Sequence, residues 1–218
     1  MPRIGRVVVP GLAHHVTQRG VRRMNVFFSD ADRRLYLRFL RDQGDRCGLH
    51  FAAWCLMHNH VHLIVVPEHA TSLARGIGEA HRRYTCSLNE REEWRGYLFQ
   101  GRFFSCPLQG IHVVAAIRYV LRNPVRAGMV SQPWEYEWSS ARWAVGRAAT
   151  DPLAERLPFT EDVNLWRELL CEEPPEADAV RRHTRSGRPF GDSEFIAQLE
   201  GVTGRALQTR SPGRPRRD

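Results

Sequence analysis

The sequence contains no lysine, no long uninterrupted apolar run and no closely spaced cysteine pair. All 32 basic residues are arginine, and charged residues interrupt every apolar stretch before it is long enough to cross a bilayer. The five cysteines are scattered and none forms a Cys-x-x-Cys pair, which argues against a zinc knuckle or a disulfide framework. The N-terminus also lacks a secretory signal. We therefore expect a cytoplasmic protein with no membrane partner.

The composition is otherwise that of an ordinary globular protein. The 218 residues are 42% hydrophobic and 26% charged, enough for one well-cored domain and a smaller appendage. The formal net charge of +8 predicts a polyanionic partner, because arginine grips phosphate oxygens in pairs. A GC-rich genome would also favour arginine over lysine, so the net charge, rather than the missing lysine, supports a nucleic-acid partner.

Hydrophobic periodicity and capping signals predict an α+β fold. The expected elements are a strand at 14–19, a helix from Ser29 to Gly44 or Gly48, strands at 49–57 and 59–66, a helix from residue 71 or 72, a strand within 97–108 with a bend or bulge at Gly101, and a helix from about 111 to Asn123 that Pro124 stops. The order β-α-β-β-α-β is the split βαβ, or ferredoxin-like, plan: an antiparallel sheet with helices packed on it.

The pattern changes near residue 145, which divides the chain into a domain at 1–145 and a helical extension at 146–218. Within the extension we expect a helix from Thr160 to Leu170, a break at Pro174-Pro175 and a helix after Asp192. The residues from 211 to 218 are rich in arginine and proline, and we expect them to be a flexible basic tail.

The segment His58-Asn59-His60-Val61-His62, followed by an apolar run, carries the chemistry. In a strand, residues two apart share a face, so His60 and His62 project together while Val61 turns away. Two imidazoles on one face supply half of a divalent metal site. His58 lies on the same side by this alternation, as a third imidazole ligand, a DNA-facing residue or a solvated one.

Tyr119 and Asn123 complete this candidate site. They are four residues apart on a predicted helix and therefore share a face. Asn123 offers a carbonyl oxygen as a third metal ligand, and Tyr119 offers a nucleophilic hydroxyl. Attack of a tyrosine on a DNA phosphodiester would leave a 5′-phosphotyrosine and a free 3′-OH. The covalent link conserves the bond, so rejoining needs no ATP, and no glycine-rich nucleotide loop is present.

Together these residues resemble the single-tyrosine HUH transposases, and within them the REP-associated tyrosine transposases. The resemblance covers roughly residues 5–145 and includes Gln100-Gly101-Arg102-Phe103 and Asn123-Pro124-Val125-Arg126. It implies Tyr119 as nucleophile, His60, His62 and Asn123 as ligands of Mg²⁺ or Mn²⁺, and cleavage and rejoining of single-stranded DNA beside hairpin-forming repeats. It also implies a bacterial, nucleoid-associated protein. Similar proteins act as monomers or homodimers, and both states stay open.

Arginines near these motifs are candidate phosphate contacts, although a solvated charged face is the alternative for about half of them. They are Arg82, Arg83, Arg102, Arg118, Arg122 and Arg126. Phe103, Phe104 and Trp94 are candidates to stack on unpaired bases, with core packing as the alternative for at least one of the phenylalanines.

Two other functions share these sequence features. One is a catalytically silent, domesticated protein that binds repeat DNA without cutting it. The other is a replication or conjugation initiator, which would need an attached helicase or a larger chain.

Overall fold

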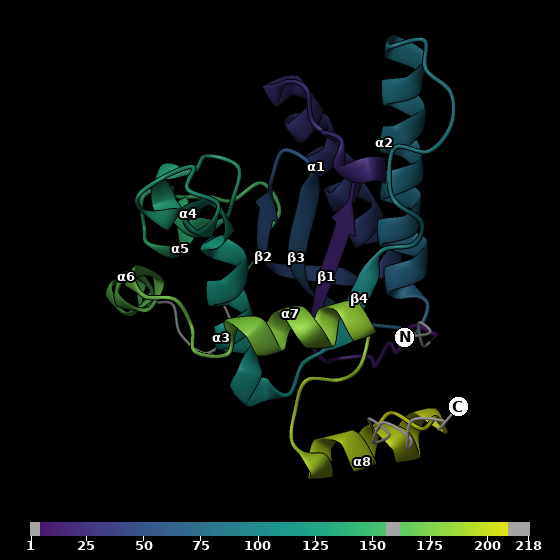
Figure 1. Ribbon diagram of the computed structural model, residues 1–218, viewed down its shortest axis with the longest axis vertical. Coiled ribbons are helices and arrows are strands. Elements are labelled where there is room, and N and C mark those ends of the chain that lie inside the picture. The colour runs from purple at the N-terminus through teal and green to yellow at the C-terminus, as the bar shows by residue number, and fades with distance from the viewer. Residues whose placement is uncertain (1–4, 156–161, 209–218) are drawn as a thin grey trace, which may run out of the picture.

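The computed structural model describes residues 5–155 and 162–208 as an antiparallel sheet with helices on both faces (Figure 1). The sheet has the order β2-β3-β1-β4. Its strands are β1 (His14–Arg19), β2 (Leu49–Leu56), β3 (His60–Pro67) and β4 (Phe104–Pro107). All three strand pairs are antiparallel, which confirms the predicted split βαβ fold.

Four helices cover the sheet, two on each face (Figure 1). One face packs against α1 (Asp30–Cys47) and α2 (Gly78–Arg91), which follows a π-helical turn at Leu73–Ile77. The other face packs against α3 (Gly110–Leu121) and α7 (Ala177–Ser186). The remaining helices are α4 (Asn123–Arg126), α5 (Ala141–Ala144), α6 (Val163–Cys171), α8 (Ser193–Thr203) and the 3₁₀ turns Val21–Arg23 and Pro133–Glu135.

Strand alternation places His60 and His62 on one face of β3 and Val61 on the other, as the sequence predicts. Val61, Leu63 and Val65 of β3 are fully buried against the α1 and α2 layer. His62 therefore points toward α3, and the register places it opposite Thr17 of β1.

Helix α1 begins and ends at the predicted signals. Ser29 accepts a hydrogen bond from the backbone of Asp32, whose carboxylate accepts one from Ser29 in return. Gly48 ends the helix with a left-handed φ of 63°, a conformation that favours glycine.

Two predicted boundaries differ from those observed. The strand expected within 97–108 spans only Phe104–Pro107, because Gly101 turns the chain with a φ of 62° and only Phe99 forms an isolated bridge to Gly20. Pro124 also does not end the helical path, which continues from α3 into α4.

An exchange of hydrogen-bond donors explains this continuation. Pro124 has no N–H for the carbonyl of Val120, and the Asn123 side chain donates to that carbonyl instead, at 3.2 Å.

The extension contains one helix that the sequence analysis missed. Asp162, rather than Thr160, caps α6, and Thr160 lies outside the described residues, as does the basic tail. Asp192 caps α8 as predicted. Helix α7 was not predicted.

The extension packs on the core of the rest of the chain. Trp166, Leu170 and Val180 of the extension are fully buried in one cluster with Ile117 and Tyr119 of α3. The division at residue 145 stays a prediction. Among the described residues, no helix is both long and apolar enough to span a membrane.

Candidate active site

The four predicted site residues line one cavity of about 260 Å³ between the sheet and helices α3 and α7. They are His60, His62, Tyr119 and Asn123. The other lining residues come from β1 (His15, Thr17, Arg19) and from α7 (Arg181, Thr184, Arg185). The structure thus brings together residues that are distant in the sequence.

The two histidines and the tyrosine are close neighbours in this cavity. The ring centroids of His60 and His62 are 5.0 Å apart, and those of His62 and Tyr119 are 5.8 Å apart. The cross-strand register places Arg19 opposite His60, so a positive charge adjoins the histidine pair.

Burial keeps both histidines neutral. Desolvation, followed by the charge of Arg19, lowers the pKa of His60 from 6.5 to about 4. Desolvation also lowers the pKa of His62 well below its ordinary value, with smaller contributions from His60, His15 and two arginines. At pH 7 each ring therefore has a lone pair that can bind a cation.

Each histidine is anchored through its Nδ1 atom. The Nδ1 of His60 lies 2.7 Å from the side-chain oxygen of Asn59, and the Nδ1 of His62 lies 2.9 Å from Nε2 of His15. His15 in turn contacts Thr184 Oγ1 through its own Nδ1, at 2.7 Å. The hydrogen bonds through Nδ1 leave the Nε2 atoms of His60 and His62 available to a cation.

The amide of Asn123 has a structural role beside its predicted role as a ligand. Its nitrogen donates to the carbonyls of Tyr119 and Val120 at 3.1 and 3.2 Å, and its oxygen accepts a bond from Arg126 at 2.9 Å. A carbonyl oxygen has two lone pairs, so one is left for a metal. No group of three His, Cys, Asp or Glu residues in the described ranges is arranged so that it could hold a metal ion, so the third protein ligand would be this amide. The two neutral imidazoles and the amide fit a divalent cation.

Tyr119 is buried, and two arginines contact it. The guanidinium carbon of Arg126 lies 4.2 Å from the centre of its ring. Arg181 of α7 lines the cavity with Tyr119, and hydrogen bonding with the phenol is the main cause of a raised pKa of Arg181. The phenol therefore faces the cavity beside a fixed positive charge.

Three of the predicted DNA-contacting arginines bind the end of α6 and the two residues that follow it. Arg118 donates to the carbonyls of Leu169 and Glu172 at 2.6 and 2.9 Å. Arg122 and Arg126 both bind the carboxylate of Glu173, at 3.3 and 2.6 Å. These three side chains hold the extension against α3 and α4, and their contact with DNA stays a prediction.

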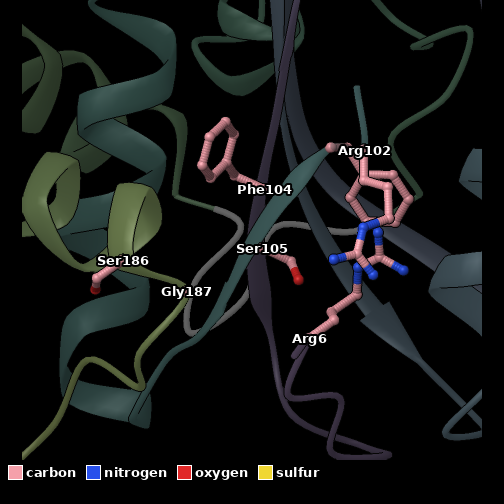
Figure 2. Close-up of a pocket in the computed structure, with 7 residues that line it drawn as sticks. Arg6, Arg102, Phe104, Ser105, Ser186 and Gly187 are labelled. Atoms are coloured by element: carbon pink, nitrogen blue, oxygen red, sulfur yellow. The ribbon is translucent and has the colours of Figure 1, made fainter. Parts of the chain in front are cut away.

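The other three predicted arginines lie away from the cavity. Arg82 and Arg83 bind Glu79 on their own helix, at 2.7 and 3.0 Å. Figure 2 shows Arg102 with Arg6 on the side of β4 toward which the Ser105 hydroxyl points, whereas Phe104 points to the opposite side. Phe104 pairs with Thr17, which lines the cavity, so Arg102 lies on the other face of the sheet.

His58 lies apart from the cavity lining. It is exposed in the turn between β2 and β3, before β3 begins at His60. Strand alternation therefore does not place His58 on the same face as His60 and His62. Its carbonyl accepts a hydrogen bond from the backbone of Val26 at 2.8 Å.

Sequence reasoning missed the positive charges and polar groups that complete the cavity. Arg181, Thr184 and Arg185 belong to α7, and only Val180 and Thr184 of that helix are buried, so no apolar stripe identified it. Alternation along β1 does place His15 and Arg19 on the same face as Thr17. That alternation was the only available signal for any of these residues.

Comparison with known proteins identifies the family of this chain. A family model described as "Transposase IS200 like" matches residues 8–123. The chain belongs to the IS200-like transposase family, which confirms the resemblance found in the sequence.

Two solved structures are similar to this chain. One is described as a REP-associated tyrosine transposase bound to a REP hairpin; it is 19% identical, with a TM-score of 0.59, and the match covers 72% of this chain and 99% of that one. The other is a putative transposase from Deinococcus radiodurans; it is 24% identical, with a TM-score of 0.37, and the match covers 56% of this chain and 97% of that one. The first supports the fold. A search of curated proteins finds no match.

Proposed function

We propose that this protein is a metal-dependent single-stranded DNA endonuclease and strand transferase whose nucleophile is Tyr119. The observation that carries the proposal is the convergence of Tyr119, His60, His62 and Asn123 on one cavity. Membership of the IS200-like transposase family supports a DNA-processing role.

His60, His62 and Asn123 would hold the cation, and the residue types suit Mg²⁺ or Mn²⁺. When bound, such a cation acts as a Lewis acid that neutralises charge on the phosphate oxygens. The chain itself holds the two imidazoles neutral by burial and orients them through Asn59 and His15.

The reaction is a transesterification. The phenol oxygen of Tyr119 forms a bond to phosphorus, and the bond between phosphorus and the 3′ oxygen breaks. The departing 3′ oxygen gains a proton in place of the one that the phenol loses. A second 3′-OH reverses the step and joins a different strand, because the energy of the phosphodiester is kept in the phosphotyrosine.

The arginines around the cavity suit a phosphodiester substrate. Arg19, Arg181 and Arg185 line the cavity beside Tyr119, and guanidinium groups bind phosphate oxygens through paired N–H donors. We infer that these three residues position the scissile phosphate.

We further propose that the substrate lies next to a hairpin-forming repeat, because a protein of the same fold is described as bound to a REP hairpin. A monomer or a homodimer acting on the nucleoid in the cytoplasm is consistent with this function.

The test incubates the protein with Mn²⁺ and single-stranded hairpin DNA labelled at its 5′ or 3′ end. A covalent protein–DNA adduct should form that carries only the 3′ portion of the strand, because the 5′ phosphate stays on the tyrosine. Tyr119→Phe should form no adduct and should retain DNA binding.

Two results would contradict the proposal. An adduct in Tyr119→Phe would mean that another residue is the nucleophile. Tight hairpin binding without any adduct in the wild type would instead favour the silent, domesticated DNA-binding protein.

A further inference from the structure

We propose that Thr184 of α7, acting through His15, keeps the proton of His62 on Nδ1 and so holds Nε2 of His62 in the form that coordinates the cation. Thr184 and His15 are then positioning residues for the metal site. The inference rests on the proposed function for the identity of the ligand atom, but the proton arrangement can be measured without metal or DNA.

The argument begins at the hydroxyl of Thr184, which has a single proton. Its Oγ1 lies 2.7 Å from the carbonyl oxygen of Val180 and donates its proton there, since a carbonyl can only accept. The same Oγ1 lies 2.7 Å from Nδ1 of His15. With its proton used, the hydroxyl accepts, so Nδ1 of His15 carries the hydrogen.

The chain of donors then extends to the metal site. A neutral imidazole that is protonated on Nδ1 has a bare Nε2. Nε2 of His15 lies 2.9 Å from Nδ1 of His62 and accepts a hydrogen bond from it. His62 is thereby protonated on Nδ1, and its Nε2 keeps the lone pair that a cation needs.

If the hydrogen bonds ran in the reverse direction, His62 would be protonated on Nε2 instead of Nδ1. If the Thr184 hydroxyl donated to His15, then His15 would donate from Nε2 to Nδ1 of His62. The proton of His62 would then lie on Nε2 and would block coordination. The bond from Thr184 to the Val180 carbonyl is therefore the contact that decides the state of the metal ligand.

Burial prevents water from taking the place of the hydrogen-bond partners in the row Thr184–His15–His62. Thr184, His15 and His62 are 2%, 1% and 6% exposed. The ring centroids of His15 and His62 are 5.1 Å apart and the ring planes differ by 14°, which suits a hydrogen bond between their in-plane nitrogen atoms. Loss of the hydroxyl would leave a buried Nδ1 without its partner, which favours a change of tautomer.

His60 offers an internal comparison because it does not depend on α7. Its Nδ1 lies 2.7 Å from Asn59 Oδ1, and the Asn59 nitrogen donates to the carbonyl of Arg23 at 3.0 Å. Changes at Thr184 should therefore alter the tautomer of His62 and leave that of His60 unchanged.

The test uses metal-free protein labelled with ¹⁵N-histidine, whose long-range ¹H–¹⁵N NMR spectrum reports the tautomer of each ring. Wild type should show His60 and His62 protonated on Nδ1. Thr184→Val, which keeps the shape and removes the hydroxyl, should change the tautomers of His15 and His62 and leave that of His60 as it is. Thr184→Ser should restore it, which a purely structural role for the methyl group would not explain.

Mn²⁺ binding, followed by electron paramagnetic resonance, is the second readout. Thr184→Val should bind about 10- to 100-fold more weakly than wild type, the usual effect of losing an outer-shell partner, and Thr184→Ser should bind about as well as wild type. The proposal is overturned if His62 is protonated on Nε2 in the wild type, or if Thr184→Val keeps both the tautomer and the affinity. A wild type with the expected tautomer but without Mn²⁺ binding would instead overturn the proposed function.

Discussion

At the residue scale, the site consists of a few polar side chains whose chemical state is set by burial and by specific partners. His60 and His62 stay neutral because they are desolvated, and the phenol of Tyr119 meets the guanidinium of Arg181. The side-chain nitrogen of Asn123 donates to the backbone carbonyl of Tyr119, and its side-chain oxygen accepts a hydrogen bond from Arg126.

Short-range periodicity was enough to predict the four central residues. A two-residue spacing in a strand places His60 and His62 on one face, and a four-residue spacing in a helix does the same for Tyr119 and Asn123. The partners of these residues were not predictable, because Thr184 reaches His15 across 169 positions of the chain through tertiary packing alone.

Arg181 gives the sharpest prediction for a single residue. Arg181→Ala should lower the rate of adduct formation about 10- to 100-fold, because a charge-assisted hydrogen bond contributes about 1.5–3 kcal/mol. The rate is measured in single-turnover reactions with labelled hairpin DNA. Arg182→Ala is the matched control, since Arg182 is exposed on the same helix, outside the cavity lining. Equal rates for the two variants would show that the phenol does not depend on Arg181.

At the scale of elements, local sequence signals predicted most helices and strands. The prediction failed where contacts with distant parts of the chain, and not local signals, stabilise the element. Ser29 and Gly48 mark the ends of α1 because their capping bonds are local. The helical path crosses Pro124 because the Asn123 side chain donates to the Val120 carbonyl, which has no N–H partner at Pro124; Arg126 also donates to the Tyr119 carbonyl. Helix α7 escaped prediction because its stability comes from packing on α3 and β4 rather than from an apolar stripe.

The segment after α6 offers a test of the arginines on α3 and α4. Glu173 occupies the guanidinium groups of Arg122 and Arg126, which the sequence predicts to contact DNA. Glu173→Gln should free these two arginines and raise the affinity for single-stranded DNA several-fold. The slope of the logarithm of the binding constant against the logarithm of salt concentration should become steeper by about one unit.

The measurement is a salt titration of binding by fluorescence anisotropy. Glu172→Gln is the control, because it removes the same charge from a residue that binds Arg118 through its backbone carbonyl. If both variants show the same salt dependence as wild type, then Arg122 and Arg126 only hold the extension in place.

At the scale of the whole molecule, two hydrophobic clusters enclose the sheet, and buried histidines elsewhere in the fold stay uncharged. Burial lowers the pKa of His14 from 6.5 to about 4 and that of His81 from 6.5 to about 3. Such rings are compatible with the fold only in the neutral form.

Stability should therefore fall in mild acid. As the pH falls below 6.5, the unfolded chain binds protons on these histidines while the folded chain does not, so the free energy of unfolding decreases toward pH 4. The two rings together should contribute a loss of at least about 3 kcal/mol between pH 7 and pH 4, measured by urea denaturation. His81→Gln should flatten this slope, and the exposed His69→Gln should not. A slope unchanged by His81→Gln would contradict the account.

The most direct test of the central claim locates the covalent bond itself. After reaction with hairpin DNA and Mn²⁺, the adduct is digested with nuclease and then with trypsin, which can cut this chain only at arginine. Mass spectrometry should find a nucleotide attached through its 5′ phosphate to the peptide Tyr119-Val120-Leu121-Arg122. A nucleotide on any other peptide, or an unmodified Tyr119 in protein that has cleaved its DNA, would contradict the claim that this tyrosine is the nucleophile.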